Sequence, residues 1–433
     1  VNLLSGQADT IAVLPTINGG TASNLRLNGQ FATVDLRNNA QTFAEITSVN
    51  TIAGTAGTIT NSGAGTVNLI SNGGGTFAGT IAGKLNFVRM GNNTTVLTNA
   101  STYTGETVVR GGNLTLVDSG ALTATSAVRL LYGALNWDNF GLNPSAVSLP
   151  TRIPAAAPIT LQGGSLVVIG TGSVDTVATF NTLNVVAGGN ILQSQPIIST
   201  GGTNRINVGN LVRNAGNRAT VQFQGWSNRN SGGNNTMGNI GLTASSLVYL
   251  TNLDGTTMNA ARMVNGIIGG WAVINGADWA VYAATADATT GARGIGNMGF
   301  AFNGANPFGT YSGNAITAGV AADNISTNAN TGDITTRTIN SWAYRNSGNT
   351  SGTANEIRMR SLDQLVSITT GGLLINNGAA AVNFLNGRMT AGTAANSSMY
   401  VFANTTAQFL NRFENNGGGT MHLVKSGPAT VTL

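Results

Sequence analysis

The chain has 433 residues, of which 41% are hydrophobic and only 8% are charged, against an ordinary charged share of about 25%. It contains no cysteine and one histidine, which excludes disulfide frameworks, thiolate zinc sites and cysteine nucleophiles and leaves His422 alone for histidine chemistry. The net charge of +5 comes from 20 cations and 15 anions without Lys/Arg-rich runs, so we expect no nucleic-acid partner.

Short alternating stretches separated by Gly and Asn recur along the chain and predict strands. A helix is weakly indicated only at 258–268, where Gly266 interrupts the pattern. No apolar run approaches the roughly 18 residues of a membrane-spanning helix, so no membrane-spanning segment is expected. The sequence therefore predicts an all-β fold, with its clearest strands at 65–70, 113–117, 165–169 and 219–224.

A Gly-Gly pair followed by an alternating strand begins at Gly111, Gly163 and Gly371, with a looser copy at Gly188. The starts at 111, 163 and 188 differ by 52 and 25 residues, which fit two turns and one turn of a repeat of roughly 25 residues. We therefore predict a right-handed parallel β-solenoid of roughly 17–20 turns, spanning 1–433 as a single elongated domain. Tandem β-sandwich domains are the alternative.

The composition follows from such a fold. In parallel stacking each strand pairs with the same strand of the next turn, about 4.8 Å away. Inward Val, Leu and Ile then form apolar columns, and outward Thr and Asn hydrogen-bond to their own kind. Charged residues would stack like over like at a repulsive cost. The low charge content is therefore expected.

The most distinctive segment is 77–116. It contains Val88-Arg-Met-Gly-Asn-Asn-Thr-Thr-Val-Leu97, the turn Tyr103-Thr-Gly105 and the strand Gly111-Gly-Asn-Leu-Thr-Leu116. This order resembles the autotransporter-associated β-strand repeat, although Ser101 stands where that repeat has Asn. The resemblance implies a secreted β-solenoid of the bacterial cell surface, without a cofactor and without an enzyme signature.

The segment Asn265-Gly-Ile-Ile-Gly-Gly-Trp-Ala-Val-Ile-Asn-Gly-Ala-Asp-Trp-Ala280 resembles the segment that links such repeats in long bacterial surface proteins, and we place a Trp-containing region between repeats at about 250–350. It includes Trp271 and Trp279, which we interpret as core or interface anchors rather than as a binding platform.

The motif begins a second time at 424–433, which aligns without gaps on 88–97. The turn and strand that follow Leu97 have no counterpart after Leu433, so we expect either one segment of a longer array or an open end. An open end presents unpaired N–H and C=O groups, and head-to-tail contact through it generates a filament. The candidate assembly residues are Val424, Gly427, Thr430, Val431, Thr432 and Leu433.

A second candidate surface lies between Asp175 and Asp254, where the sequence has no acid but several arginines. Arginine charge and tryptophan stacking suit an anionic polysaccharide. An outward ladder or a subunit contact is the simpler interpretation. The residues concerned are Arg205, Arg213, Arg218, Trp226 and Arg229.

Together these features predict a non-enzymatic, extracellular structural protein that binds copies of itself head to tail. A monomeric surface adhesin or polysaccharide-binding module is the alternative. An enzyme of the β-helical lyase or hydrolase type would rest on the fold alone. Neither a cofactor nor a metal is expected.

Overall fold

A computed structural model describes residues 23–140, 149, 151–171, 174–196, 203–214, 216–225, 246–283, 294–298, 309–345, 354–376, 380–392, 396–417 and 419–433, and the backbone alone of 2–3 and 10–12. The chain divides into two compact units, each described by itself. Unit 1 comprises 1–217, 225–235 and 240–256, and unit 2 comprises 218–224, 236–239 and 257–433. The single elongated domain stays a prediction.

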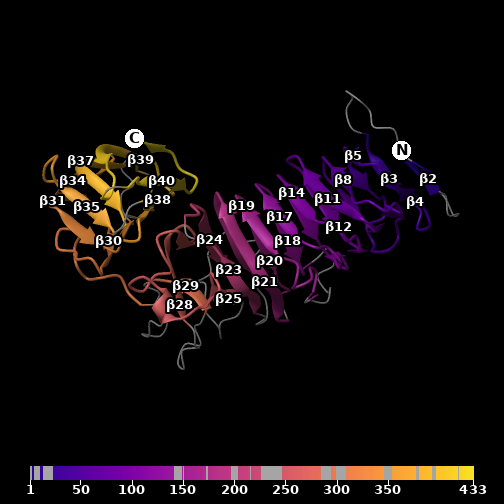
Figure 1. Ribbon diagram of the computed structural model, residues 1–433, viewed down its shortest axis with the longest axis horizontal. Coiled ribbons are helices and arrows are strands. Elements are labelled where there is room, and N and C mark those ends of the chain that lie inside the picture. Colours follow the sequence, from indigo (N-terminus) through magenta and orange to yellow (C-terminus); the bar gives the residue numbers. More distant parts are fainter. Residues whose placement is uncertain are drawn as a thin grey trace. The chain divides into compact units, whose positions relative to one another are not determined.

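Unit 1 is built on long sheets whose strands pair in parallel, apart from the short strand at 256–257 (Figure 1). The strands of its first sheet, in the order in which they pair, are β5 (Gln41–Phe43), β8 (Val67–Ser71), β11 (Leu85–Met90), β14 (Thr107–Arg110), β17 (Val128–Leu131), β19 (Ile159–Gln162), β21 (Thr176–Ala187), β23 (Asn204–Val212) and β25 (Ser246–Leu253), with the short β26 (Thr256–Thr257) beyond it.

A second parallel sheet takes the strand that follows each strand of the first from β8 to β21. Its strands are β9 (Gly75–Phe77), β12 (Thr94–Leu97), β15 (Asn113–Leu116), β18 (Ala134–Asp138), β20 (Ser165–Ile169) and β22 (Gly189–Gln195). Shorter parallel groups are β1 (Asn2–Leu3), β3 (Leu25–Leu27) and β6 (Ile46–Thr47); β2 (Thr10–Ala12), β4 (Thr33–Asp35), β7 (Thr58–Thr60) and β10 (Thr80–Ile81); and β13 (Ala100–Ser101) with β16 (Ala121–Leu122). A stretch of chain that contributes one strand to each of the two main sheets of its unit is called a pass, here and in unit 2 below.

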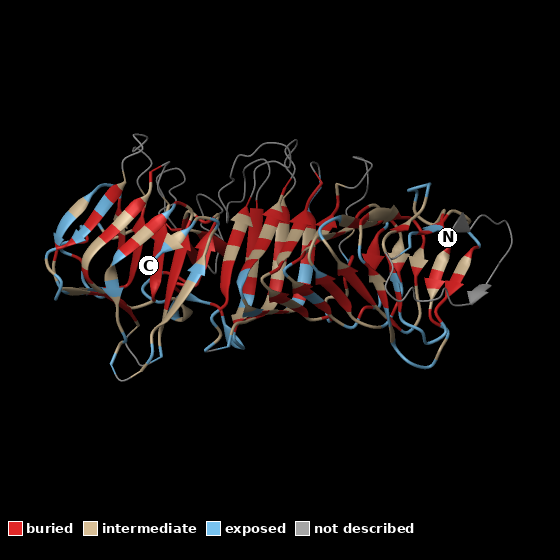
Figure 2. Cartoon of the chain, turned by 90° about the horizontal axis from the view of Figure 1, so that it is seen from above, coloured by how far each residue is buried: buried red, intermediate tan, exposed pale blue. Residues whose placement is uncertain are grey.

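Parallel register places apolar side chains of successive passes over one another. In the second sheet, Leu97 pairs with Phe77 on one side and with Leu116 on the other, and all three are buried. Their strands alternate buried with half-buried positions, as a one-sided strand should. The burial colours of Figure 2 follow this alternation along the strands. Tandem sandwiches have antiparallel sheets, so that alternative is wrong for the described sheets.

The outward faces carry the predicted amide and hydroxyl ladders. Asn86 Nδ2 donates to Oδ1 of Asn68, one pass earlier, over 3.0 Å. In the second sheet, Asn113 Nδ2 donates to the Thr94 hydroxyl at 3.2 Å. These bonds between residues paired in register confirm the prediction that uncharged polar side chains bond across neighbouring strands.

The Gly-Gly signature marks the corner between the two long sheets. Gly111, Gly163 and Gly188 each lie between a strand of the first sheet and one of the second, and all have positive φ. One further corner, at Gly133, falls between 111 and 163, so the 52-residue interval spans two passes, as predicted. Pass length is irregular, however, since in-register partners lie from 18 residues apart at Leu69 and Phe87 to 42 apart at Leu211 and Leu253.

Unit 2 contains two further parallel sheets. The inner sheet pairs β30 (Asn324–Thr327), β33 (Ser341–Tyr344), β36 (Gly372–Ile375), β38 (Ser398–Ala403) and β40 (His422–Ser426) in that order. The outer sheet contains β31 (Thr331–Ile334), β32 (Arg337–Ile339), β34 (Asn355–Met359), β35 (Leu365–Ile368), β37 (Val382–Ala391), β39 (Ala407–Phe413) and β41 (Val431–Thr432).

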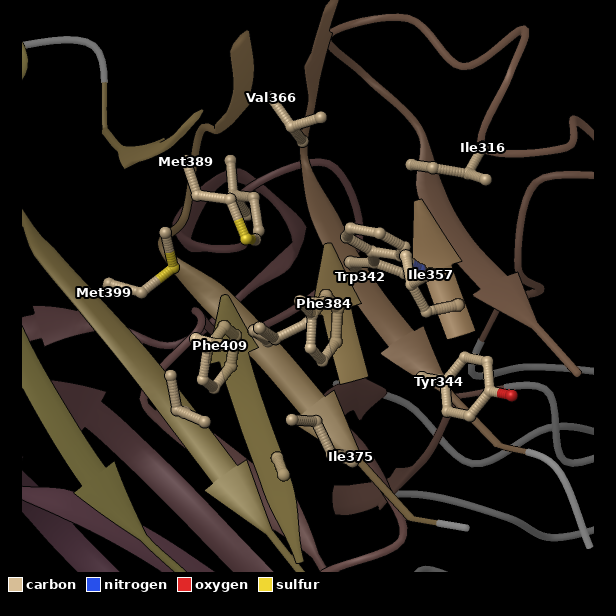
Figure 3. Close-up of a cluster of buried hydrophobic side chains, with 14 of the residues drawn as sticks. Ile316, Trp342, Tyr344, Ile357, Val366, Ile375, Phe384, Met389, Met399 and Phe409 are labelled. Carbon is tan, nitrogen blue, oxygen red and sulfur yellow. The ribbon is translucent and has the colours of Figure 1, made fainter. Parts of the chain in front are cut away.

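The core of unit 2 contains a column of aromatic rings between these sheets (Figure 3). Phe384 stacks on Phe409 with ring centroids 4.7 Å apart, and Trp342 meets Phe384 edge-on at 5.7 Å. Each ring comes from a different strand and is almost fully buried. The column therefore adds side-chain packing to the backbone pairing of β37 with β39, and it joins both strands to β33 of the inner sheet.

A group of strands that includes antiparallel pairs, which the sequence did not predict, covers the other face of the inner sheet. Trp279 meets Phe402 edge-on at 6.4 Å, and a Cβ added at Gly372 would lie 2.7 Å from the Trp279 ring. Trp279 is fully buried, which confirms its role as a core anchor. The strands are β24 (Thr220–Gly225), parallel to β27 (Ala272–Ile274), and then β28 (Asp278–Ala283) and β29 (Gly294–Asn297), both antiparallel to the preceding one.

The weak helix signal at 258–268 corresponds to a single 3-10 turn, η1 (Ala260–Arg262), capped by the Asn259 side chain. Within the described ranges, no helix has the length and apolar character needed to cross a membrane.

Replacing Phe384 by Ala should lower the free energy of unfolding of unit 2 by about 3–5 kcal/mol, because the ring is buried between two other aromatic groups. Urea denaturation followed by tryptophan fluorescence measures the change. The control Leu362→Ala removes a side chain that is 76% exposed and should cost little. Equal effects of the two substitutions would contradict this packing.

Candidate functional site

The last strands of unit 2, β40 and β41, each end a sheet. His422 N donates to Ser397 O at 2.9 Å, and Ala407 N donates to Thr430 O at 3.0 Å. Because successive residues of a strand point their N–H and C=O groups to opposite sides, the backbone groups of Lys425 and Val431 point away from these neighbours. Among the described residues, no strand pairs with that outer edge.

The same end of unit 2 is also where its apolar core is incompletely covered. The hydrophobic residues that pack against the core while remaining partly exposed all come from 413–431, and Leu433 beside them is 71% exposed. Strand edge and apolar surface therefore coincide. The partly covered residues are Phe413, Met421, Leu423, Ala429 and Val431.

The segment 424–433 folds like 88–97, with which it aligns. In both segments a strand is followed by a glycine turn and a second strand. The glycines are Gly91, with φ of +79°, and Gly427, with φ of +83°. A Cβ at either would lie against a carbonyl oxygen of the preceding pass, 2.2 Å away at Gly91 and 2.5 Å at Gly427. A left-handed backbone against another backbone leaves room only for glycine.

The six predicted assembly residues therefore lie together on β40, its turn and β41. Val424 lies on the face of β40 that also carries His422 and Ser426. This face is in contact with 218–224, because Arg218 Nη2 lies 2.7 Å from His422 Nε2 and the Thr220 hydroxyl donates to Ser426 Oγ at 3.1 Å. The segment 218–224 thus contacts one face of β40. The outer edge of β40 remains unpaired within the described part of unit 2.

The predicted polysaccharide surface is only partly described. Arg205 is on β23 with its guanidinium 5.7 Å from the centre of the Tyr249 ring. Arg213 follows the end of β23, and its backbone N–H donates to Asp254 at 2.5 Å. Arg218 belongs to unit 2, and Trp226 and Arg229 lie outside the described residues. The polysaccharide surface therefore stays a prediction.

A partly buried ion pair in unit 2, with a tyrosine bonded to its carboxylate, was missed from the sequence. The Tyr311 hydroxyl donates to Asp278 Oδ1 at 2.5 Å, and Arg345 Nη1 lies 3.4 Å from Asp278 Oδ2. The Arg345 guanidinium also lies 4.3 Å from the centre of the Tyr311 ring and donates to the Ser326 hydroxyl. The cluster ties β28 to the 311 loop and to the ends of β30 and β33. The available signal was a lone aspartate within an apolar strand.

Burial raises the pKa of Asp278 to about 6, although the Tyr311 hydrogen bond and the Arg345 charge oppose the shift. The carboxyl can therefore take up or release one proton in mildly acidic solution. Among the described residues, no three His, Cys, Asp or Glu side chains gather as metal ligands.

Comparison with known proteins gave no match. No family model matches the chain, and no curated protein or solved structure is significantly similar to it.

The pKa of Asp278 has a consequence for stability. Because this pKa is about 6 in the folded chain, against an ordinary value of 3.8 for an aspartate, the folded state holds the proton more tightly than the unfolded state. This contribution to stability is present below pH 4 and is lost as the pH rises through 6. The loss amounts to about 3 kcal/mol.

Replacing Asp278 by Asn should remove this pH dependence, because the amide does not ionise. Urea unfolding of both proteins at pH 4.5 and pH 7 measures it, and the variant should gain relative to the natural chain at pH 7. Identical pH profiles for the two proteins would show that Asp278 does not titrate in this range.

Proposed function

We propose that the protein is an extracellular, non-enzymatic structural protein, a right-handed parallel β-solenoid whose last strands pair with the first strands of another copy. The observation that carries this proposal is the end of unit 2, where unpaired parallel strand edges and a partly exposed apolar core coincide. An exposed strand edge is a template for pairing with another chain.

The beginning of the chain supplies a partner of matching chemistry. The strands β1 and β2 end two sheets of unit 1, and each pairs in parallel with the next pass on one side only within the described residues. Parallel pairing has the same polarity at both ends of a stack, so the edge of a last strand can accept a first strand as the next pass. Such contacts are heterologous and propagate into filaments.

Two sequence features support self-association and a location at the bacterial cell surface. The low charge content and the amide ladders suit a surface that packs against copies of itself. The resemblance of 77–116 to the autotransporter-associated repeat supports a bacterial cell-surface location.

Electron microscopy and sedimentation velocity test the proposal directly. The natural chain should form filaments or end-to-end oligomers as its concentration rises. A chain that remains monodisperse at high concentration would contradict the assembly function.

Replacing Val431 by Pro should weaken assembly without removing a bond to β39, because the lost N–H points to the outer edge. The lost donor and the proline ring should cost about 1–3 kcal/mol per joint and raise the concentration needed for assembly about tenfold or more. Val431→Thr keeps the N–H and the shape of the side chain and is the matched control. Equal assembly of the two variants would exclude this edge as the joint.

A further inference from the structure

One corner in the middle of unit 1 carries a tyrosine where the neighbouring passes have glycine. Tyr132 directly follows β17, as Gly111 follows β14, Gly163 follows β19 and Gly188 follows β21. All four residues have positive φ, which is +62° at Tyr132. Glycine adopts this conformation freely, whereas a bulky side chain is rarely found in it. Tyrosine is therefore an unfavourable residue for the backbone of this corner.

The side chain of Tyr132 gains little inside the chain that would offset this cost. The residue is 74% exposed, and its hydroxyl forms no hydrogen bond with any part of the chain that the structure describes. Neither burial nor hydrogen bonding thus accounts for a tyrosine at this position. An unfavourable backbone conformation without internal compensation is a reason to look for a function of the side chain.

Contact with the next pass holds the ring in one orientation. A Cβ added at Gly163 would lie 2.7 Å from Cδ1 and 2.8 Å from Cε1 of Tyr132, so this side of the ring lies directly on the Gly163 backbone. Tyr132 N also donates to Gln162 O at 3.1 Å. The rest of the ring is open to solvent and can be covered by a ligand.

Two polar side chains accompany this ring on the outward face of the first sheet. Arg110 ends β14 and Gln162 ends β19, on the passes before and after Tyr132. The residue before each of them is fully buried, so alternation directs both side chains outward. In the parallel register, both are neighbours of Leu131, the residue that precedes Tyr132.

Neither polar group has a partner of its own among the described residues. Arg110 is exposed and forms no ion pair with them, and the Gln162 side-chain amide forms no hydrogen bond with them. Arg129 on the same face differs, because its guanidinium lies 3.8 Å from Glu106. An aromatic ring, a guanidinium and an amide are therefore available together on three consecutive passes.

These three groups match the chemistry of an acidic sugar. A pyranose ring presents C–H groups on one face, which pack on an aromatic ring, and hydroxyls at its edge, which bond to amides. A uronate adds a carboxylate, which a guanidinium binds through two parallel hydrogen bonds. A protein partner is less well matched, since a stable interface covers on the order of 800 Å² per partner around an apolar centre.

We propose that Tyr132, Arg110 and Gln162 form a binding site for an acidic polysaccharide. The Tyr132 ring stacks on one sugar unit, Arg110 binds a carboxylate, and the Gln162 amide bonds to hydroxyls. None of these residues was predicted from the sequence as a site. The inference does not depend on head-to-tail assembly, because β14, β17 and β19 lie inside the first sheet and not at its ends.

Calorimetric titration of the natural chain tests the site, with polygalacturonate, alginate and hyaluronan as acidic ligands and dextran as the neutral control. The chain is kept dilute, so that assembly does not contribute to the heat. We expect binding of at least one of the three acidic polymers and no binding of dextran. Failure to bind any of the three, or equal binding of dextran, would overturn the proposal.

Tyr132→Gly removes the ring and gives the corner the residue that its neighbours have. Binding should weaken at least about tenfold, while the urea midpoint should stay the same or rise, because glycine fits a positive φ. Phe31→Ala, which removes another exposed aromatic ring of unit 1, is the control and should bind normally. Unchanged binding by Tyr132→Gly would exclude the stacking role, and a clear fall of its urea midpoint would assign the ring a structural role instead.

Arg110→Gln removes the partner of the carboxylate and should also weaken binding about tenfold or more. Arg26→Gln makes the same charge change at another exposed arginine of unit 1 and should bind normally. Equal losses in the two variants would show attraction by net charge alone and would overturn the site.

The outcomes also separate this site from the proposed function. A natural chain that binds an acidic polymer but never assembles contradicts the assembly function and leaves the site standing. Filaments that are lost in Tyr132→Gly, without any polysaccharide binding by the natural chain, would assign the ring to a contact between copies and overturn the polysaccharide site.

Discussion

The structure depends on parallel pairing of each strand with the equivalent strand of the next pass. In this arrangement a side chain meets, about 4.8 Å away, the side chain at the same position of its neighbour. Apolar residues therefore form continuous columns, such as Phe77, Leu97 and Leu116. Ionised residues would repel their neighbours, and the chain has few of them.

Parallel pairing also explains two kinds of residue that are neither apolar core nor polar ladder, namely the glycines at the corners and the buried arginines. Corners between sheets bring backbones against one another, and glycine occupies them at Gly91 and Gly427 because a Cβ would meet a carbonyl of the preceding pass. Both fully buried arginines of the described residues donate to backbone carbonyls. They are Arg89 and Arg152, and Arg152 donates to the Asn139 side chain at 2.8 Å and to the Asp138 carbonyl at 3.0 Å.

Much of this fold could be predicted from the sequence, because alternation and turn residues act locally. The strands at 65–70 and 113–117 and the corners at Gly111, Gly163 and Gly188 were predicted correctly. The variable pass length was not, since insertions between strands leave no periodic signal. Neither were the antiparallel strands β27 and β28, whose short apolar runs resemble those of the parallel strands.

The candidate site, like the fold, was predicted in part from the sequence and missed in part. The clustering of Val424 to Leu433 followed from an internal repeat, which is a local signal. The meeting of Asp278, Tyr311 and Arg345 depends on three segments that are distant in sequence, and alternation carries no information about it.

The outward ladders have a consequence for the environments that such a protein tolerates. The bonds between Asn86 and Asn68 and between Asn113 and Thr94 join neutral dipoles, whose attraction dissolved ions screen far less than that of opposite charges. Hydrogen bonds of this kind should therefore have similar strength at low and at high salt concentration. Because amides and hydroxyls do not titrate between acid and alkaline pH, the ladders also stay uncharged.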